Sequence, residues 1–328
     1  MSRLHTRSLQ ASGSDDLMVR VSVREGLEKI ANDRSHGSTW LAHQGLNLLS
    51  SFARSSDVTS SEEYLRLLTF LVEKVSNLRP AMASIRNLSN FALRLLEGRY
   101  SCRADLSYLR TMTVRIAVTL GSRLKLATRG AALTATRNLR VSKTILVHSH
   151  SSTLESTFQM VKRRLNRVYI TESRPLYEGR ILAGKLARMG IKAVLITDAS
   201  GPGFVGECDC VLVGADSVLA DGSIVNKTGT LALALAAREF RVPFLAVADS
   251  SKVNAEAILH KGQFLEEMPG REVYTGKLDV QIRNPYFEVV PGNLVTSIFC
   301  ELGAFKPGRI RSLARSSSRF WLTGIKRD

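Results

Sequence analysis

Long apolar runs are absent from this sequence of 328 residues. No stretch approaches the roughly 20 apolar residues that a membrane-spanning helix needs. The first 16 residues are polar and mixed in charge, and Asp15 and Asp16 interrupt any amphipathic targeting pattern. These absences predict a cytoplasmic protein that makes no contact with a membrane.

Cysteine is scarce, with only Cys102, Cys208, Cys210 and Cys300 in the chain. Cys208 and Cys210 form a C-x-C pair, but no second pair follows at the spacing of a zinc site. We therefore expect reduced thiols in a reducing compartment, with no metal site and no cofactor.

Acidic residues are few relative to basic ones, 29 against 46, which gives a net charge of +17. Much of the excess lies in residues 103–143 and 306–327. A basic surface of this kind attracts RNA, the ribosome or another polyanion, or is simply solvated. Aromatic residues make up only 6% of the chain, and none interleave with basic ones as in RNA-binding motifs, so RNA contact is the weaker interpretation.

The first part of the chain has the apolar spacing of helices. Apolar residues recur at helical intervals in residues 21–30, 40–52, 64–75 and 106–127, and again after Pro80. This pattern predicts a helical N-terminal domain over residues 1–125.

The rest of the chain alternates short β-branched runs with helical patterns. The runs are residues 144–148, 167–171, 193–197, 210–214, 244–248 and, more weakly, 287–290. The helical patterns between and after them are residues 152–165, 179–189, 230–240 and 294–302. This alternation predicts an α/β protein whose residues 126–328 form a Rossmann-like, doubly wound parallel sheet.

Ligands of such sheets bind at the carboxyl ends of the strands, where polar residues here are dense. Ser149, Ser151 and Ser152 follow the first strand and precede a helix, which suits an anion cradle better than a single helix cap. Glu172 and Arg174 follow the second strand, and either a phosphate contact or a salt bridge explains them.

Later strand ends carry further polar candidates. Asp198 follows the third strand and either binds a hydroxyl or caps a helix. Asp216 follows the buried fourth strand, where it is a general acid–base, a ligand of a sugar hydroxyl, or the cap of the next turn. Asn226 and Lys227 come next, and Lys252 follows the fifth strand, which gives two point charges for phosphate.

In the helical half, residues 33–39 form a polar patch that contains Arg34, His36, Gly37 and Ser38. The patch is either an anion site or a capped turn between helices. Arg79, before Pro80, is either a ligand arginine or part of a helix start.

The segments Gly214-Ala215-Asp216 and Asn226-Lys227-Thr228-Gly229-Thr230 together resemble the signature of one family. It comprises the alpha, beta and delta subunits of translation initiation factor 2B, ribose-1,5-bisphosphate isomerase and methylthioribose-1-phosphate isomerase. The resemblance implies a helical domain on a Rossmann-like domain, pairing of subunits, and a phosphosugar pocket between the domains. By resemblance, that pocket is lined by Arg34, His36, Gly37, Ser38, Arg79, Ser151, Ser152, Asn226, Lys227 and Lys252.

The chain departs from the isomerase pattern at two places. Residues 33–39 are a looser version of the family's Arg-Gly-Ala-Gly phosphate loop, and the catalytic cysteine is replaced. Asp216 stands at the position of the family's catalytic aspartate, but Ser149 stands at that of its catalytic cysteine. A thiol of pKa about 8.5 exchanges protons near neutral pH, whereas an alcohol is far too weak an acid. Whether this chain is an enzyme is therefore open.

We expect first a protein similar to the initiation factor 2B alpha subunit, which binds a phosphorylated sugar or nucleotide in a regulatory role. The alternative is an aldose–ketose isomerase on a phosphopentose such as ribose-1,5-bisphosphate or methylthioribose-1-phosphate. In both cases the resemblance implies a homodimer or larger homo-oligomer. Ile298, Phe299 and Cys300, on the last predicted helix, are the expected contact residues.

Overall fold

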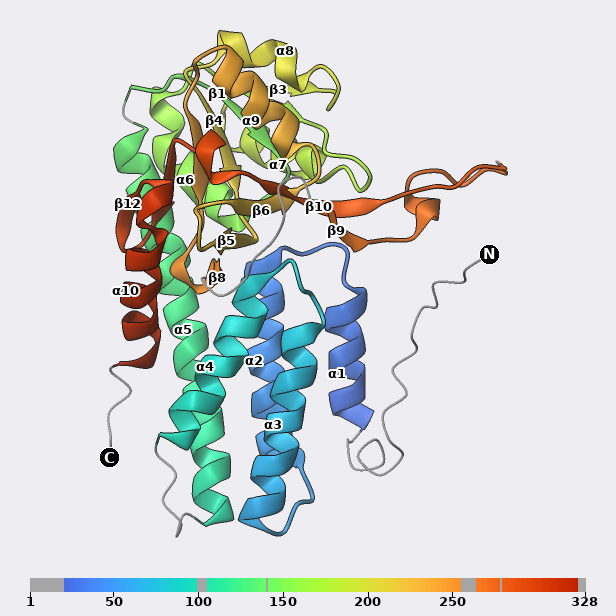
Figure 1. Cartoon of the computed structure of the whole chain (residues 1–328), viewed down its shortest axis with the longest axis vertical. Coiled ribbons are helices and arrows are strands. Elements are labelled where there is room, and N and C mark those ends of the chain that lie inside the picture. The colour runs from blue at the N-terminus through green and yellow to red at the C-terminus, as the bar shows by residue number, and fades with distance from the viewer. Residues whose placement is uncertain (1–20, 99–104, 140, 255–263, 278, 324–328) are drawn as a thin grey trace.

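Helices fill the first part of the chain (Figure 1). The computed structural model describes residues 21–98, 105–139, 141–254, 264–277 and 279–323. Its first helices are α1 (Val21–Asn32), α2 (Ser38–Ser55), α3 (Ser61–Asn77), α4 (Ala83–Glu97) and α5 (Leu106–Asn138). The predicted helices are confirmed, and α5 continues through residue 125, where we placed the domain boundary.

Side chains cap two of these helices and apolar contacts hold them together. Ser60 accepts a hydrogen bond from the backbone of α3, and Asp105 does the same for α5. The core between the helices is leucine-rich, with Leu41, Leu88 and Leu120 fully buried. Burial of such side chains contributes about 1.5–3 kcal/mol each.

A seven-stranded sheet forms the second layer. Its order is β12-β11-β7-β4-β1-β2-β3, and all neighbours are parallel except β12 on β11. The bounds are β1 (Thr144–His148), β2 (Arg167–Thr171), β3 (Ala193–Ile196), β4 (Cys210–Gly214), β7 (Phe244–Val247), β11 (Ser297–Cys300) and β12 (Gly303–Phe305). The predicted α/β class, with a mostly parallel sheet behind a helical N-terminal part, is confirmed.

Helices cover both faces of this sheet. The end of α5, α6 (Ser152–Val161) and α7 (Glu178–Arg188) share one core with Leu212, whereas α9 (Thr230–Glu239) and α10 (Ile310–Leu322) share the other with Val211. The short α8 (Gly201–Phe204) also lies on the second face. Successive strand residues point to opposite faces, and both faces are covered by helices. Every residue of β4 is therefore buried, which is why this strand is apolar throughout.

A second, mixed sheet lies between the first sheet and the helical layer (Figure 1). Its order is β8-β5-β6-β10-β9, with β5 (Ser217–Leu219), β6 (Ile224–Lys227), β8 (Val253–Asn254), β9 (Phe264–Glu267) and β10 (Pro285–Val290). Val225 faces the helical core and Ile224 faces the sheet core, so this sheet joins the two layers. The predicted strand at residues 287–290 belongs to it. Short 3₁₀ turns complete the chain at Lys162–Arg164, Val205–Glu207, Ser250–Lys252, Gly270–Glu272, Gly292–Leu294 and Pro307–Arg309.

The predicted helix at residues 294–302 is wrong. Residues 297–300 form β11, which pairs with β7 and β12. Ile298, Phe299 and Cys300 are buried there, with at most 3% of each side chain exposed, and are not available for a contact between subunits. The misassignment has a physical cause, because a short apolar run buried on both faces has no periodicity that separates strand from helix.

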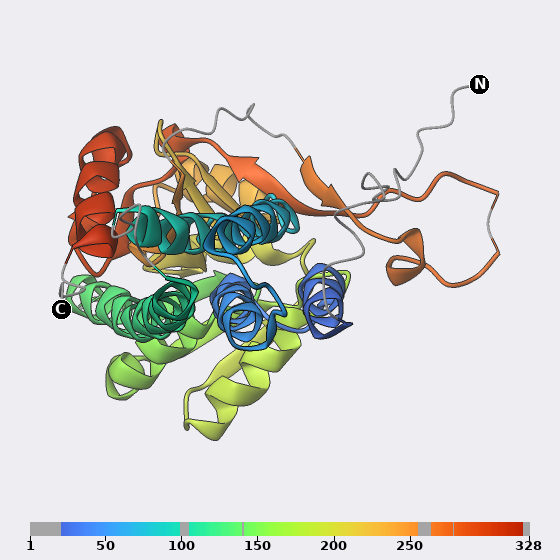
Figure 2. The same ribbon diagram turned by 90° about the horizontal axis from the view of Figure 1, so that it is seen from below.

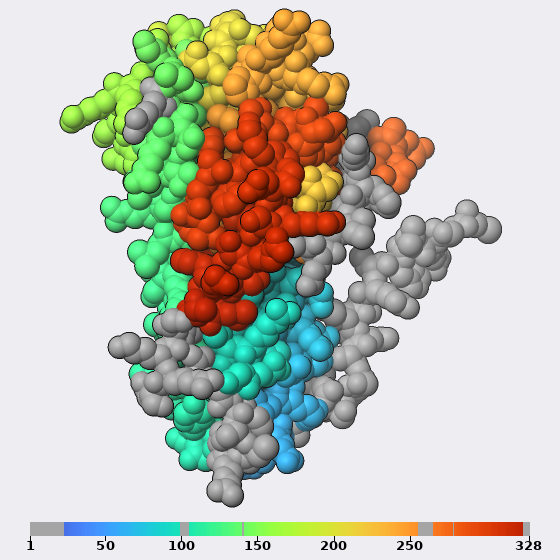
Figure 3. Space-filling view, turned by 60° about the vertical axis from the view of Figure 1, so that its left-hand side comes forward, coloured from blue at the N-terminus to red at the C-terminus, as the bar shows by residue number. Residues whose placement is uncertain are grey.

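After β12 the chain returns along the helical layer as α10, beside α4 and α5 (Figures 1 and 2). In the view of Figure 3 the C-terminal segment covers this edge of the molecule. Trp321 is fully buried, and its indole N–H donates to Ser250 Oγ at 3.0 Å. Arg123 of α5 donates to the carbonyl oxygens of Phe320 and Trp321. These contacts tie the C-terminal helix to the turn after β7.

No helix in the described ranges is both long enough and apolar enough to cross a membrane. Cys208, Cys210 and Cys300 are buried free thiols, and burial raises the pKa of Cys208 and Cys210 to about 12. Cys102 and residues 1–20 lie outside the described residues, as do parts of both basic stretches.

Candidate functional site

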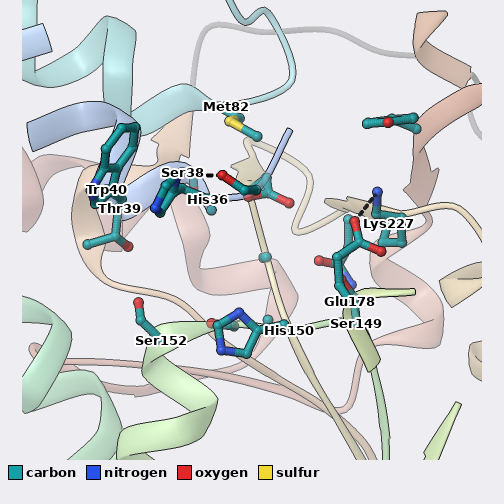
Figure 4. A pocket seen from close by; sticks show the side chains of 18 of the residues that line it. His36, Ser38, Thr39, Trp40, Met82, Ser149, His150, Ser152, Glu178 and Lys227 are labelled. Atoms are coloured by element: carbon teal, nitrogen blue, oxygen red, sulfur yellow. Dashed lines mark hydrogen bonds and ion pairs between the residues drawn. The ribbon is translucent and has the colours of Figure 1, made fainter. Parts of the chain in front are cut away.

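A cavity of about 440 Å³ lies between the helical layer and the carboxyl ends of β1 and β4 (Figure 4). That volume is ordinary for a small-molecule site. Twelve of the predicted site residues line it: Arg34, His36, Gly37, Ser38, Arg79, Ser149, Ser151, Ser152, Asp216, Asn226, Lys227 and Lys252. The structure therefore brings the candidates together, while their roles stay predictions.

Two helices begin at the cavity without a side-chain cap. Gly37, which precedes α2, has no side chain to cap with, and the side chain of Ser151, which precedes α6, makes no capping hydrogen bond. Helix N-termini expose backbone N–H groups and carry a partial positive charge, so they attract anions. The Ser151 hydroxyl is thus not used for capping, which was the alternative to anion binding.

Lys227 supplies a positive charge on the opposite side. Its ammonium lies 2.7 Å from Glu178 Oε1 and 4.1 Å from the ring centroid of Tyr286. Lys227 is 4% exposed, and the second oxygen of Glu178 is buried without a hydrogen-bond partner. The dashed line in Figure 4 marks the ion pair. A buried polar atom without a partner is costly, and here a ligand donor could satisfy it.

The two arginines of the site hold its loops. Arg79 pairs with Glu266 at 2.8 Å and donates to the carbonyl of Asp33, and it is only 4% exposed. Arg34 donates to the carbonyls of Ala31 and Asp33. Both guanidinium groups therefore fix the loop before α2, and they add positive charge to the cavity wall.

His36 and Asp33 shape the rim above this loop. Asp33 accepts hydrogen bonds from the backbone of Ser35 and His36 and from the His36 ring at 2.8 Å. The ring stacks on Trp40 with centroids 3.8 Å apart. This geometry is the capped turn foreseen as one interpretation of residues 33–39, and the same turn lines the cavity.

The chain leaves the sheet immediately after β1. Ser149 has φ of 65°, in the left-handed region, and its N–H donates to Ser173 Oγ at 2.8 Å. In a strand, neighbouring side chains alternate between faces. The left-handed residue ends this alternation, so that Ser149, His150 and Ser151 all line the cavity.

His148, the last residue of β1, has a structural role. Its ring is buried between Thr171 Oγ1 at 2.6 Å and the carbonyl oxygen of Thr228 at 2.9 Å. Burial lowers the pKa of His148, which keeps the imidazole neutral near pH 7. Both ring nitrogens have partners, so this histidine braces the loop after β6.

His150 faces the cavity and belongs to a charged triad. Its Nε2 lies 3.2 Å from Glu155 Oε2, and Lys185 Nζ lies 2.7 Å from the same oxygen. Burial lowers the pKa of His150, whereas the pKa of Glu155 is lowered by hydrogen bonds from Lys185 and His150 that outweigh its partial burial. A neutral imidazole beside an ionised carboxylate can accept a proton at neutral pH.

Asp216 and Lys252 complete the site. Asp216 follows β4, and its backbone is held by Val225 at 2.8 Å and by Ala83 of α4 at 3.2 Å. Lys252 ends the turn after β7 and is 3% exposed. Asn226 donates to Thr230 Oγ1, which connects β6 to the start of α9. The backbone of Asp216 is thus held between two layers.

Two strand-end candidates lie outside the cavity. Arg174 bonds to the Tyr177 hydroxyl and to the carbonyl of Val273, not to Glu172, which pairs instead with Arg180. Asp198 accepts the backbone N–H groups of Ser173 and Arg174, each at 2.7 Å, and caps no helix. Both residues hold the loop after β2.

Several lining residues were not foreseen from the sequence, notably Glu155, Glu178, Lys185 and Tyr286. Glu178 follows the strand-end loop of residues 172–175 and begins a helix. This position in the sequence could have identified it as a residue of the site. Lys185 and Tyr286 reach the site from the middle of α7 and from the second sheet, and no local pattern marks them. In the described ranges, no three His, Cys, Asp or Glu side chains are arranged to hold a metal.

Comparison with known proteins places the chain in a family. The model of the initiation factor 2 subunit family matches residues 34–307. The chain is 32% identical to ribose 1,5-bisphosphate isomerase of Archaeoglobus fulgidus over 87% of this chain and 90% of that protein. It is 33% identical to a putative translation initiation factor eIF-2B subunit 2-like protein of Pyrococcus horikoshii, over 89% of this chain and 99% of that one.

A solved structure of a similar fold supports the same family. The 5-methylthioribose 1-phosphate isomerase of Pyrococcus horikoshii superposes with a TM-score of 0.70 at 26% identity, covering 89% of this chain and 86% of that one. The family model spans most of the chain, and the relatives match it nearly end to end. The chain therefore belongs to the initiation factor 2 subunit family.

Proposed function

We propose that this protein is an aldose–ketose isomerase that acts on a phosphopentose such as ribose-1,5-bisphosphate or methylthioribose-1-phosphate. Several relatives carry the names of such isomerases. Those names favour this function over the regulatory role that we expected first from the sequence.

The observation that carries the proposal is the composition of the cavity between the helical layer and the carboxyl ends of β1 and β4. Two uncapped helix N-termini, the Ser151 hydroxyl and the ammonium groups of Lys227 and Lys252 give it the chemistry of a phosphate site. Asp216 stands among them as a carboxylate at the end of a buried strand. A sugar held by its phosphate would present its carbons and hydroxyls to this group.

Isomerisation of a furanose 1-phosphate needs one acid and one base. The bond between C1 and the ring oxygen breaks, and the ring oxygen gains a proton. The hydrogen of C2 leaves as a proton and returns to C1, while the C2 hydroxyl loses its proton and becomes the ketone. No net oxidation occurs. We assign Asp216 to the oxygens: it protonates the ring oxygen and recovers a proton from the C2 hydroxyl.

The test is to incubate the protein with each of the two sugars and follow the ketone carbon by ¹³C NMR. We expect a ketose from one of them, and a loss of about 100-fold or more in rate for Asp216→Asn with binding retained. Binding of both sugars without any ketose would overturn the isomerase function.

A second candidate is a regulatory protein that binds a phosphorylated sugar or nucleotide without turning it over. One observation favours it: the residue at the family's cysteine position is Ser149, and its hydroxyl is a poor acid. The same NMR experiment separates the two functions, since this candidate predicts tight binding that is weakened by Lys227→Met and no product.

We also propose that the protein forms a homodimer or larger homo-oligomer, as its family resemblance implies. The residues first expected at the contact are buried in β11, so other surfaces would form it. Light scattering tests this, and a monomeric mass at micromolar concentration would refute it.

A further inference from the structure

The proposed isomerisation needs a group that takes a proton from carbon near neutral pH, and Ser149 does not supply it. Its alcohol is far too weakly acidic to exchange protons at that pH. The described cysteines are also unsuitable, because Cys208, Cys210 and Cys300 are buried thiols that do not line the cavity. Among the described residues, the candidates for the base are therefore the other side chains of the cavity wall.

His150 is placed for that role by its hydrogen bonds. Lys185 donates to Glu155 at 2.7 Å, and this leaves Glu155 to accept the Nε2–H of His150 at 3.2 Å. Nε2 also lies 3.3 Å from Lys185 Nζ, which can only donate, so the contacts of Nε2 alone do not fix the tautomer. We assign the ring proton to Nε2, facing the Glu155 carboxylate, and this leaves the lone pair on Nδ1. Among the hydrogen bonds of the described residues, those of the ring all involve Nε2.

The surroundings keep this ring in its basic form. The charged groups that face it are Glu155 of α6 and Lys185 and Glu178 of α7. Burial is the largest influence and lowers the pKa of His150, so the imidazole is neutral at pH 7. A carboxylate behind the imidazole stabilises the cation that forms when the ring takes up a proton.

The other cavity histidine is less suited. His36 bonds through Nδ1 to Asp33 at 2.8 Å, and its ring stacks on Trp40. Its side chain is 44% exposed, against 21% for His150. In Figure 4 His150 lies near Ser149 and Ser152, whereas His36 lies beside Trp40 and Ser38.

We propose that His150 is the base of the reaction and that Glu155 is its positioning residue, an inference that rests on the isomerase function proposed above. His150 Nδ1 takes the proton from C2 as the C1–ring oxygen bond breaks, and the electron pair of the C2–H bond becomes the C1–C2 double bond. Asp216 protonates the ring oxygen in that step. In the second step, the imidazolium returns its proton to C1, and Asp216 recovers one from the C2 hydroxyl. The His150–Asp216 pair thus begins and ends the cycle with one proton between the two groups.

The experiment measures ketose formation across pH 5–9 for the wild type and for three variants: His150→Gln, Glu155→Gln and the double variant Ser149→Cys/His150→Gln. Calorimetric binding of the same sugar shows that each variant is folded. We expect His150→Gln to lose about 100-fold or more in kcat with little change in affinity. Glu155→Gln should lose about tenfold and move the acid limb of the pH profile to lower pH.

The double variant gives a result that a structural role for His150 cannot produce. A thiol at position 149 restores a group of pKa about 8.5, so activity should return in part with a limb on the alkaline side. If the wild type forms ketose and His150→Gln stays within threefold of it, this inference is overturned and the isomerase function stands. If the wild type forms no ketose, the function fails and the inference fails with it.

Discussion

The ammonium of Lys227 lies 2.7 Å from Oε1 of Glu178, so this buried cation of the cavity already has a counter-ion. The side chains are 5% and 19% exposed, which places the pair in a region of low dielectric. A phosphate that enters the cavity must share Lys227 with this carboxylate. Glu178 therefore both holds the lysine in place and limits the affinity of the site for anions.

Neutralising Lys227 and neutralising Glu178 should have opposite effects on the affinity for anions. Lys227→Met removes a charged donor and should weaken binding of a phosphorylated pentose by about tenfold or more. Glu178→Gln frees the lysine and should strengthen binding severalfold. Isothermal titration calorimetry measures both, with the exposed Lys192→Met as the control for a lost surface charge. Equal weakening by both variants would contradict this description of the pair.

Gly229 is a second position for which the structure gives a specific prediction. Its φ is 107°, and a Cβ there would lie 2.9 Å from Cε1 of the His148 ring. Gly229→Ala should lower the free energy of unfolding by about 1–3 kcal/mol, because it combines backbone strain with a clash against a fixed ring. Urea denaturation measures this.

The matched control is Gly184→Ala, in the middle of α7. A Cβ at Gly184 meets no atom within 4 Å. The same substitution there should raise the free energy of unfolding by up to about 1 kcal/mol, through helix propensity. Two glycines with equal responses would show that neither the clash nor the left-handed backbone matters.

Glu301 should make stability depend on pH. Burial, and then the nearby Asp249, raise the pKa of Glu301 to about 7 in the folded protein. A raised carboxyl pKa means that the folded state holds a proton that the unfolded state has lost. This contribution is complete below about pH 4.5 and disappears as the pH rises through 7.

Glu301→Gln keeps the side chain neutral at every pH. Its stability relative to the wild type should therefore improve by about 2 kcal/mol between pH 5 and pH 8. Denaturation at the two pH values measures the difference, with the exposed Glu25→Gln as the control. A difference that does not change with pH would show that Glu301 is ionised throughout.

The sequence predicts a site residue well where a general rule connects its position in the chain with its location in the fold. Parallel strands end at one edge of a sheet, so Ser151, Asp216 and Lys252 could be placed together from their strands alone. The loop of residues 33–39 needed the family resemblance, because nothing local says that a helix start in another layer faces this edge.

The rest depends on packing that has no periodic signature. Lys185 reaches Glu155 from a neighbouring helix, and Trp321 reaches Ser250 across the molecule. If the strand continued, His150 and Ser149 would point to opposite faces of the sheet. The left-handed backbone of Ser149 ends this alternation, and no glycine in the sequence marks the turn. The basic charge of the stretch after residue 305 was evident from the sequence, but α10 was not predicted there. Its buried face consists of only a few residues, such as Leu313 and Trp321.

The most direct test of the proposed function is to carry out the reaction in D₂O with the wild-type protein and ribose-1,5-bisphosphate or methylthioribose-1-phosphate. Proton transfer through His150 predicts a ketose that carries deuterium at C1 in the fraction of turnovers in which the imidazolium exchanges its proton with the solvent before it returns one to C1, detected by ¹H and ²H NMR. A sugar that binds in the cavity but keeps both its aldose form and its hydrogen at C2 would contradict the account.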